Sequence, residues 1–182
     1  RLAEMMVDVR EHSPVLGLER SGERWTVRTE GGPIMADHVV VALGAAANSL
    51  LSPIGVTLPL IGAKGYSIDL TGTGEPPRHA LYLMEAKLGL SPLERGVRIA
   101  GFFELPGSGS DIPERRVRQL VELSKPYLGG WVPDAGTISH AGGGLRPATP
   151  DSLPFIGPVP GHDGLFVAAG HGMLGVTLAP ST

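Results

Sequence analysis

The chain has 182 residues, and its 15 lysines and arginines against 18 aspartates and glutamates give a formal net charge of −3 at pH 7. This balance lacks the basic excess that nucleic-acid-binding proteins usually show. The absence of cysteine excludes disulfide bonds, thiolate metal sites and a cysteine nucleophile. Hydrophobic residues make up 42% of the chain, which is enough for a packed core. No apolar run reaches the roughly 18 residues of a membrane-spanning helix.

The first part of the chain predicts a β-meander that leads into a buried strand. Residues 7–10, 15–19 and 25–29 alternate between apolar and polar side chains, as half-buried strands do. Residues 37–44 contain a continuous apolar run, which is typical of a strand buried on both faces of a sheet. A short helix is expected over residues 45–51.

The middle of the chain predicts an extended segment, a strand pair and a helix. We expect residues 58–70 to be extended and residues 81–90 and 97–105 to pair as strands. The helix is expected to start at Asp111, whose carboxylate can cap the first turn, and to end near Tyr127.

The C-terminal part is rich in glycine and proline. Residues 142–158 contain so many turn-forming residues that we expect rigid, irregular backbone there. Residues 164–169 predict a buried strand, which leads into the sequence GHGMLG at 170–175. The chain starts without a methionine and ends at Thr182, where a helix has only just begun. We therefore expect a part of a longer protein that is truncated at both ends.

Two local patterns are candidates for a binding site. The glycines in Gly170-x-Gly172-x-x-Gly175 let a phosphate or a ring approach the backbone, but they also suit a turn that packs a helix tightly on a sheet. As a dinucleotide fingerprint, the pattern lacks the second strand and the acidic residue that should follow it. Arg146 can clamp a substrate carboxylate, or it can be an ion-paired surface residue. No metal site and no Ser-His-Asp arrangement is expected.

Several segments together resemble the D-amino-acid oxidase superfamily of FAD-dependent enzymes. They are ADHVVVALGA at 36–45, LPLIGAKGYS at 58–67, GLRPATPDSLPFIG at 144–157 and GHGMLGVTLAP at 170–180, and their order and spacing agree with that superfamily. The last two segments are most similar to D-amino-acid dehydrogenases. The sequence EHSPV at 11–15 is similar to a strand of glycine oxidases.

The resemblance implies oxidation of the C–N bond beside an amino-acid carboxylate, with hydride transfer to N5 of FAD and hydrolysis of the imine. It implies that Arg146 grips the carboxylate and that Tyr66 and Tyr82 line the pocket. It assigns no general acid or base, because the substrate amine can arrive neutral. The residues that it places at FAD are Val15, Gly44, Ala45, Gly170, His171, Gly172, Met173, Leu174, Gly175 and Val176.

The resemblance also implies an α+β fold in two parts. Residues 1–55 and 142–182 are expected to belong to an α/β flavin-binding domain, and residues 56–141 to form a substrate domain with an antiparallel sheet. The N-terminal strand-GxGxxG-helix that holds the FAD pyrophosphate in this superfamily is a missing partner segment, so we expect the isolated chain to be inactive. Two positions depart from the superfamily pattern, because Ala46 stands for a usual tryptophan and Gly142 for a common aromatic residue.

Alternatives remain open at this point. The parent protein could be a glycine or sarcosine oxidase that uses O2 directly, and the electron acceptor could instead be a quinone or a dye-type acceptor. A third hypothesis is a non-catalytic module that has kept the fold and lost flavin binding. The expected partners are a small amino-acid substrate and no nucleic acid. The expected location is the cytoplasm, with peripheral association with the inner membrane face as an alternative.

Overall fold

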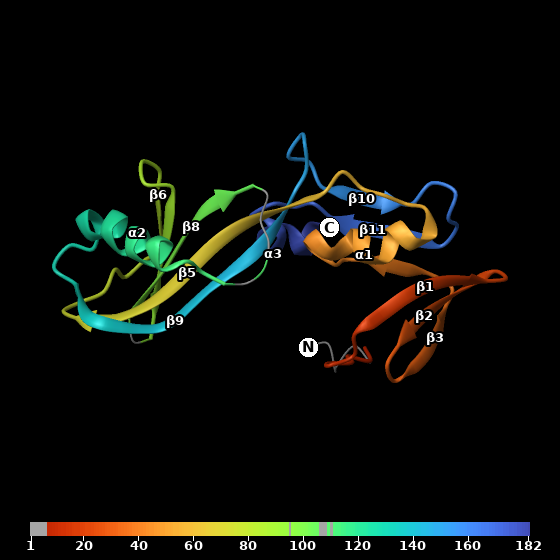
Figure 1. Cartoon of the computed structure of the whole chain (residues 1–182), viewed down its shortest axis with the longest axis horizontal. Helices are drawn as coiled ribbons and strands as arrows, with labels where there is room; N and C mark the ends of the chain where they lie inside the picture. Colours follow the sequence, from red (N-terminus) through yellow and green to blue (C-terminus); the bar gives the residue numbers. More distant parts are fainter. Residues whose placement is uncertain (1–6, 95, 106–108, 110) are drawn as a thin grey trace. The chain divides into compact units, whose positions relative to one another are not determined.

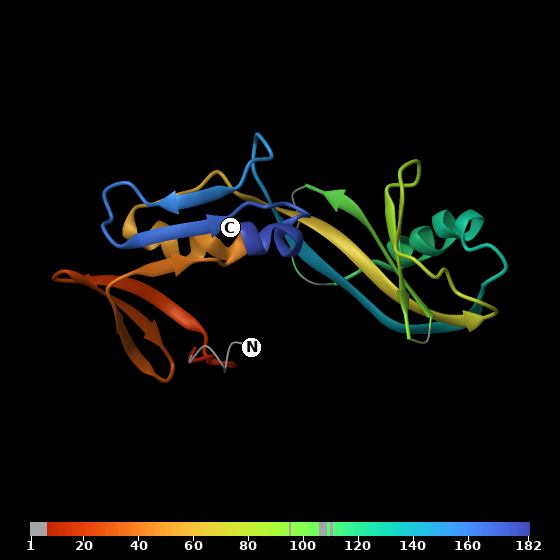
Figure 2. The same ribbon diagram turned by 180° about the vertical axis from the view of Figure 1, so that it is seen from behind.

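A computed structural model describes residues 7–94, 96–105, 109 and 111–182. The chain divides into two compact units (Figures 1 and 2). One contains the described residues up to Leu60 together with Thr149–Thr182, and the other is Ile61–Ala148. The second unit is therefore inserted into the sequence of the first. The mixed α+β class predicted from the sequence is confirmed, with sheets predominating over short helices.

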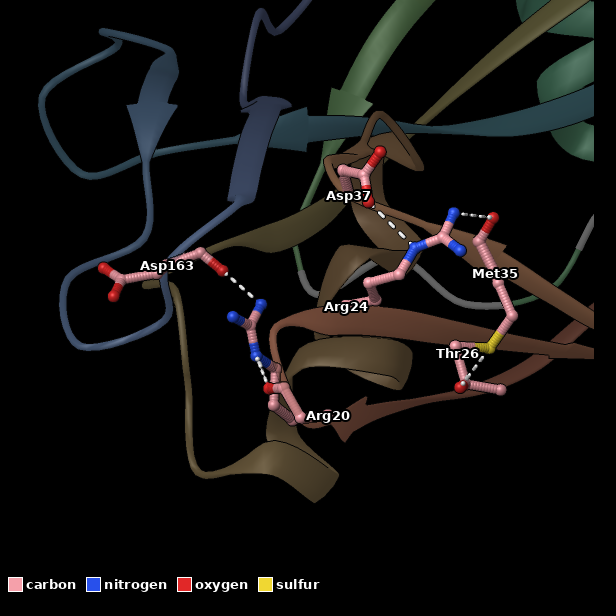
Figure 3. A network of polar contacts seen from close by, with 7 residues as sticks. Arg20, Arg24, Thr26, Met35, Asp37 and Asp163 are labelled. Atoms are coloured by element: carbon pink, nitrogen blue, oxygen red, sulfur yellow. Dashed lines mark hydrogen bonds and ion pairs between the residues drawn. The ribbon is translucent and has the colours of Figure 1, made fainter.

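The first unit begins with an antiparallel meander of β1 (Val15–Ser21), β2 (Arg24–Thr29) and β3 (Gly32–Ala36). Polar contacts hold this meander to the loop before β11, as Figure 3 shows for Arg20. The Arg20 guanidinium donates to the carbonyl oxygen of Asp163 at 2.7 Å, and the indole of buried Trp25 donates to the same oxygen at 2.9 Å.

A second sheet in this unit has the order β10-β11-β4. It consists of β10 (Phe155–Pro158), β11 (Leu165–Ala169) and β4 (Val39–Val41). β4 and β11 run parallel, so their carboxyl ends lie at the same edge of the sheet. The chain continues from β4 into the helical turns η2 (Gly44–Ala46), α1 (Ala47–Leu51) and η3 (Ser52–Ile54).

The second unit is built on one five-stranded antiparallel sheet with the order β6-β7-β8-β5-β9. Its strands are β5 (Ile61–Thr73), β6 (Leu81–Leu83), β7 (Leu88–Leu93), β8 (Gly96–Glu104) and β9 (Val132–Ala148). The long strands β5 and β9 pair from Ile61 opposite Ala148 onward, so the two ends of this unit lie side by side.

One face of this sheet is covered by α2 (Glu114–Ser124), which lies across it in Figure 1 and is followed by the turn η4 (Lys125–Tyr127). Leu120 of α2 is fully buried against apolar side chains of that face. The sheet contributes Tyr66, Ile68, Leu70, Leu83, Leu88, Leu90, Val97 and Ile99 to this core. Because side chains alternate along a strand, the residues between these point to the opposite face.

Three local predictions differ from the structure. Residues 7–10 form no strand, because Val7 and Val9 are exposed and have no buried face to occupy. The predicted strand at 81–90 is two strands, β6 and β7, separated by a turn in which Lys87 has a φ of 55°. The cap at Asp111 was also wrong: α2 starts at Glu114 after Pro113, and no side chain caps it.

The largest difference concerns residues 142–148, which were expected to be irregular and instead form the end of β9. Gly142, Gly143 and Gly144 lie opposite consecutive residues of β5, so pairing with that strand holds the glycine run in an extended conformation. The unit boundaries consequently fall after Leu60 and after Ala148, whereas the sequence placed them after residues 55 and 141. In the described part of the chain, no helix has the length and apolar character that crossing a membrane requires.

Candidate functional site

Arg146 lies on the sheet face that α2 does not cover. It pairs with Ala63 of β5, and its guanidinium reaches back over Gly65. A Cβ atom at position 65 would stand only 2.5 Å from Nη2 of Arg146, so a side chain there would displace the guanidinium. The Nε atom of Arg146 is buried and has no hydrogen-bond partner among the described residues. A buried, unsatisfied N–H of a guanidinium is costly unless a ligand acceptor completes it.

The surface beside Arg146 is made of small residues. One row across the sheet runs from Gly89 through Ala100 and Ser67 to Gly142, according to the register of the four strands. The next row contains Gly65 and Gly144, and Gly144 has open space where a Cβ would stand. We call these six residues the small-residue floor. Arg146 itself is half-buried beside this floor.

A polar cluster adjoins the small-residue floor. Asp69 accepts two hydrogen bonds from Arg98, at 2.7 Å from Nε and 2.8 Å from Nη2. The pKa of the Asp69 carboxyl lies below its ordinary value, chiefly because of these hydrogen bonds from Arg98. Burial opposes this effect and raises the pKa, whereas the positive charge of Arg98 and interaction with His140 lower it further. His140 lies opposite Asp69 on β9, and its ring Nε2 stands 3.2 Å from the place of a Cβ at Gly142.

The two tyrosines predicted for the pocket lie on opposite faces of this sheet. Tyr66 is buried in the core beneath α2, and its hydroxyl donates to Glu104 at 2.6 Å. Tyr82 is 57% exposed and belongs to the row of the small-residue floor, since it pairs with Gly89. The structure therefore brings Tyr82 to the face of Arg146 and places Tyr66 behind it.

Glu104 connects Tyr66 to the covering helix. It also forms an ion pair with Arg116 of α2, whose guanidinium lies 4.7 Å from the ring centroid of Phe102. Phe102 has a φ of 68° at a bulge in β8, opposite the segment between Lys64 and Tyr66. These contacts fix the position of β5 directly behind the Arg146 site.

In the first unit, two predicted cofactor segments follow the parallel strands β4 and β11. Gly44 and Ala45 form the turn after β4, and residues 170–175 form the loop after β11, up to the short helix α3 (Gly175–Leu178). Ligands of α/β sheets bind at this carboxyl edge. Gly170 and Gly172 have φ values of 92° and 56°, which favour glycine.

The loop after β11 exposes the side chains of Met173, Leu174 and Val176, the last to 94%. His171 accepts or donates one hydrogen bond with the Thr182 hydroxyl at 3.1 Å. Thr149 lies against Gly170, and its hydroxyl oxygen is buried without a partner among the described residues. This orphaned hydroxyl and the exposed apolar side chains fit a loop that contacts a bound ring system.

Val15 lines a hollow of about 380 Å³ between the meander and the second sheet. The walls are largely apolar and include Leu18, Val41, Leu43 and Leu50. Leu43 directly precedes Gly44, so the hollow adjoins the turn after β4. A hollow of this size and polarity fits a heteroaromatic ring such as adenine.

Sequence reasoning did not single out Asp69, Arg98, His140 or Thr149 as site residues. Thr149 lies within the segment 144–157 but received no role there. Asp69, Arg98 and His140 lie in no motif, because they come from three strands and meet only through the sheet register. Alternation along β5 places Asp69 and Gly65 on one face, and this was the signal available in the sequence.

Comparison with known proteins agrees with the sequence motifs. The chain matches the family described as FAD dependent oxidoreductase (DAO) over residues 1–182. It is 39% identical over 157 residues to a D-amino acid dehydrogenase of Rhizorhabdus wittichii, and the matched region covers 84% of this chain and 36% of the relative. It is 38% identical over 161 residues to D-amino acid dehydrogenase 2 of Ralstonia nicotianae, covering 84% of this chain and 38% of the relative. The chain thus spans well under half the length of these relatives.

The fold is similar to that of solved structures. Glycine oxidase from Geobacillus kaustophilus superimposes with a TM-score of 0.79 at 26% identity, covering 94% of this chain and 46% of the oxidase. L-proline dehydrogenase from P. horikoshii shares the fold with a TM-score of 0.75 at 22% identity, covering 94% and 47% of the two chains. The resemblance predicted from the sequence is confirmed, and the chain belongs to the DAO family of FAD-dependent oxidoreductases.

Proposed function

We propose that the protein containing this chain oxidises the C–N bond of a D-amino acid or a related amino acid. The observation that carries the proposal is the guanidinium of Arg146, which lies over Gly65 and whose buried Nε has no hydrogen-bond partner among the described residues. A carboxylate would satisfy this N–H and a neighbouring one with two parallel hydrogen bonds. The names of the D-amino acid dehydrogenase relatives support the same substrate class.

FAD, when bound, supplies the acceptor for the hydride that leaves the substrate Cα. In this chain, the residues that would hold it are Val15 at the apolar hollow, Gly44 and Ala45 at the turn after β4, and residues 170–176 at the glycine-rich loop. Their apolar surfaces and the orphaned Thr149 hydroxyl fit such a group.

The task of Arg146 is binding and orientation. A bidentate carboxylate contact fixes two atoms of the substrate and so limits the directions in which the Cα–H bond can point. The small-residue floor leaves space for the substrate side chain next to that contact. No side chain of the described residues is assigned as a base, because a substrate that binds with a neutral amine needs none.

Replacement of Arg146 tests the proposal. In the full-length protein, Arg146→Ala should raise the KM for D-amino acids roughly 30-fold or more, because loss of a buried charge-assisted contact costs about 2 to 5 kcal/mol. Flavin reduction by D-amino acids is followed under anaerobic conditions. Arg78→Ala is the matched control, since Arg78 forms an ion pair with Glu75 in which both side chains are highly exposed. Unchanged kinetics in Arg146→Ala would remove this residue from the carboxylate site.

A second candidate is an oxidase of the glycine or sarcosine type that passes electrons directly to O2. The similarity of the fold to glycine oxidase supports this second candidate. Both candidates use Arg146 in the same way and differ in the electron acceptor. Oxygen consumption that keeps pace with substrate oxidation supports the oxidase, whereas turnover that requires a dye or a quinone supports the dehydrogenase. Full-length protein that retains no flavin would instead support a non-catalytic module.

A further inference from the structure

His140 and Arg146 present hydrogen-bond donors on the same face of the sheet. They are six positions apart on β9, an even spacing, so their side chains leave the strand on the same side. The His140 ring lies beside Gly142, and the Arg146 guanidinium lies over Gly65, which pairs with Gly144. In the register of β5 and β9, Gly142 and Gly144 of the small-residue floor separate the two places.

The distance between the two groups suits a short ligand. Gly142 lies on β9, whereas Gly65 lies on β5 and pairs with Gly144. The places of the two groups are therefore offset by roughly 6.6 Å along the strands and about 4.8 Å across them, or about 8 Å in all. A molecule that accepts a hydrogen bond of about 2.8 Å at each end must therefore be short. An amino acid whose side chain ends in a carboxylate or carboxamide oxygen meets this condition.

The charges on this face favour an acceptor oxygen over other side chains. The carboxylate of Asp69 is already bound at both oxygens by Arg98, which leaves the charge of Arg146 unbalanced within this group. The Cβ positions of Ser67, Ala100 and Gly142 offer little apolar area to an aliphatic side chain. An imidazole carries at least one N–H in either protonation state, so His140 can donate a hydrogen bond.

We propose that His140 determines the substrate class of this protein. The substrate is an amino acid with a short side chain that ends in a carboxylate or carboxamide oxygen. Its α-carboxylate binds Arg146 and its side-chain oxygen accepts a hydrogen bond from His140. This inference rests on the proposed function, because it takes Arg146 as the site of the α-carboxylate.

The test compares substrates in the full-length protein. His140→Ala should lower kcat/KM for D-aspartate, D-glutamate and D-glutamine about tenfold to a hundredfold, the usual effect of losing a hydrogen bond to a charged or buried acceptor. The value for D-alanine, whose side chain has no acceptor, should stay the same. His140→Gln keeps an N–H donor and should recover part of the loss. His79→Ala is the matched control, because His79 is an exposed histidine of the same unit.

A binding measurement separates this inference from the proposed function. Calorimetry with succinate and with butyrate compares ligands of equal chain length that differ in the second carboxylate. His140→Ala should weaken succinate about tenfold and leave butyrate unchanged, whether or not the protein turns over any amino acid. Equal losses for both ligands, or a wild-type preference for aliphatic or cationic D-amino acids, would overturn the role of His140. Absence of flavin reduction by every amino acid, with selective succinate binding intact, would overturn the proposed function alone.

Discussion

At the scale of single residues, the Asp69–Arg98 pair contributes to stability as well as to the surface of the site. Asp69 is buried and its folded-state pKa is lowered, chiefly by the hydrogen bonds from Arg98. A carboxyl group with a lowered pKa stabilises the fold fully above its unfolded value of about 3.9. This stabilisation is lost as the pH falls through the lower folded-state value.

Asp69→Asn should therefore lower the free energy of unfolding by about 1 kcal/mol at pH 7, a figure that allows for the partial exposure of Arg98. The difference from wild type should shrink as the pH falls below 4. Urea unfolding at several pH values measures it. Glu75→Gln removes one partner of an exposed ion pair and should change little at any pH. A difference that stays constant with pH would show that the charge of Asp69 does not stabilise the fold.

Gly65 gives a second prediction at this scale. A methyl group there would meet the guanidinium of Arg146 at 2.5 Å and push it aside. Gly65→Ala should weaken binding of butyrate about tenfold or more, as expected when a charge-assisted hydrogen bond is broken, and should change the melting temperature little. Gly144→Ala, on the paired residue with open space, is the control for adding a methyl group to the same floor. Equal effects of the two substitutions would contradict the assigned position of Arg146.

At the scale of elements, α2 is held to the sheet by one side of the helix. Leu120 is fully buried, whereas Leu123 on the same helix is 43% exposed. Leu120→Ala should cost about 2 to 5 kcal/mol of stability, and Leu123→Ala less than about 1 kcal/mol. Chemical denaturation of the two variants measures the contrast. Similar losses would mean that α2 is not anchored through Leu120.

The elements also show what a sequence can reveal. The strands at β1, β2 and β11 follow from the alternation or continuity of apolar residues, and the family motifs located Arg146 and the loop at 170–175. The sequence did not reveal that residues 142–148 form a strand, because the glycines and the proline in this segment are typical of turns. It also missed His140 and Asp69, whose proximity depends on register across β5 and β9.

At the scale of the whole molecule, the second unit has its own core and its two ends are paired. Ile61 lies opposite Ala148, so a polypeptide of residues 61–148 would begin and end at paired strand residues and would keep all five strands of the sheet. We predict that this polypeptide folds by itself and unfolds cooperatively. Circular dichroism and dispersion of its amide resonances check the prediction. A spectrum typical of an unfolded chain would show that the core beneath α2 requires the first unit.

The sheet of the second unit keeps its apolar core on one face, and the Asp69–Arg98 pair and the small-residue floor on the other. Mutations that reshape the floor therefore do not have to disturb the packing that holds the unit together. Larger residues at Ser67, Ala100 or Gly142 would reduce the space on the floor step by step, while Arg146 stays unchanged. Under the proposed function, this arrangement would let substrate preference drift during evolution at little cost in stability. It makes these three positions suitable for a focused mutant library.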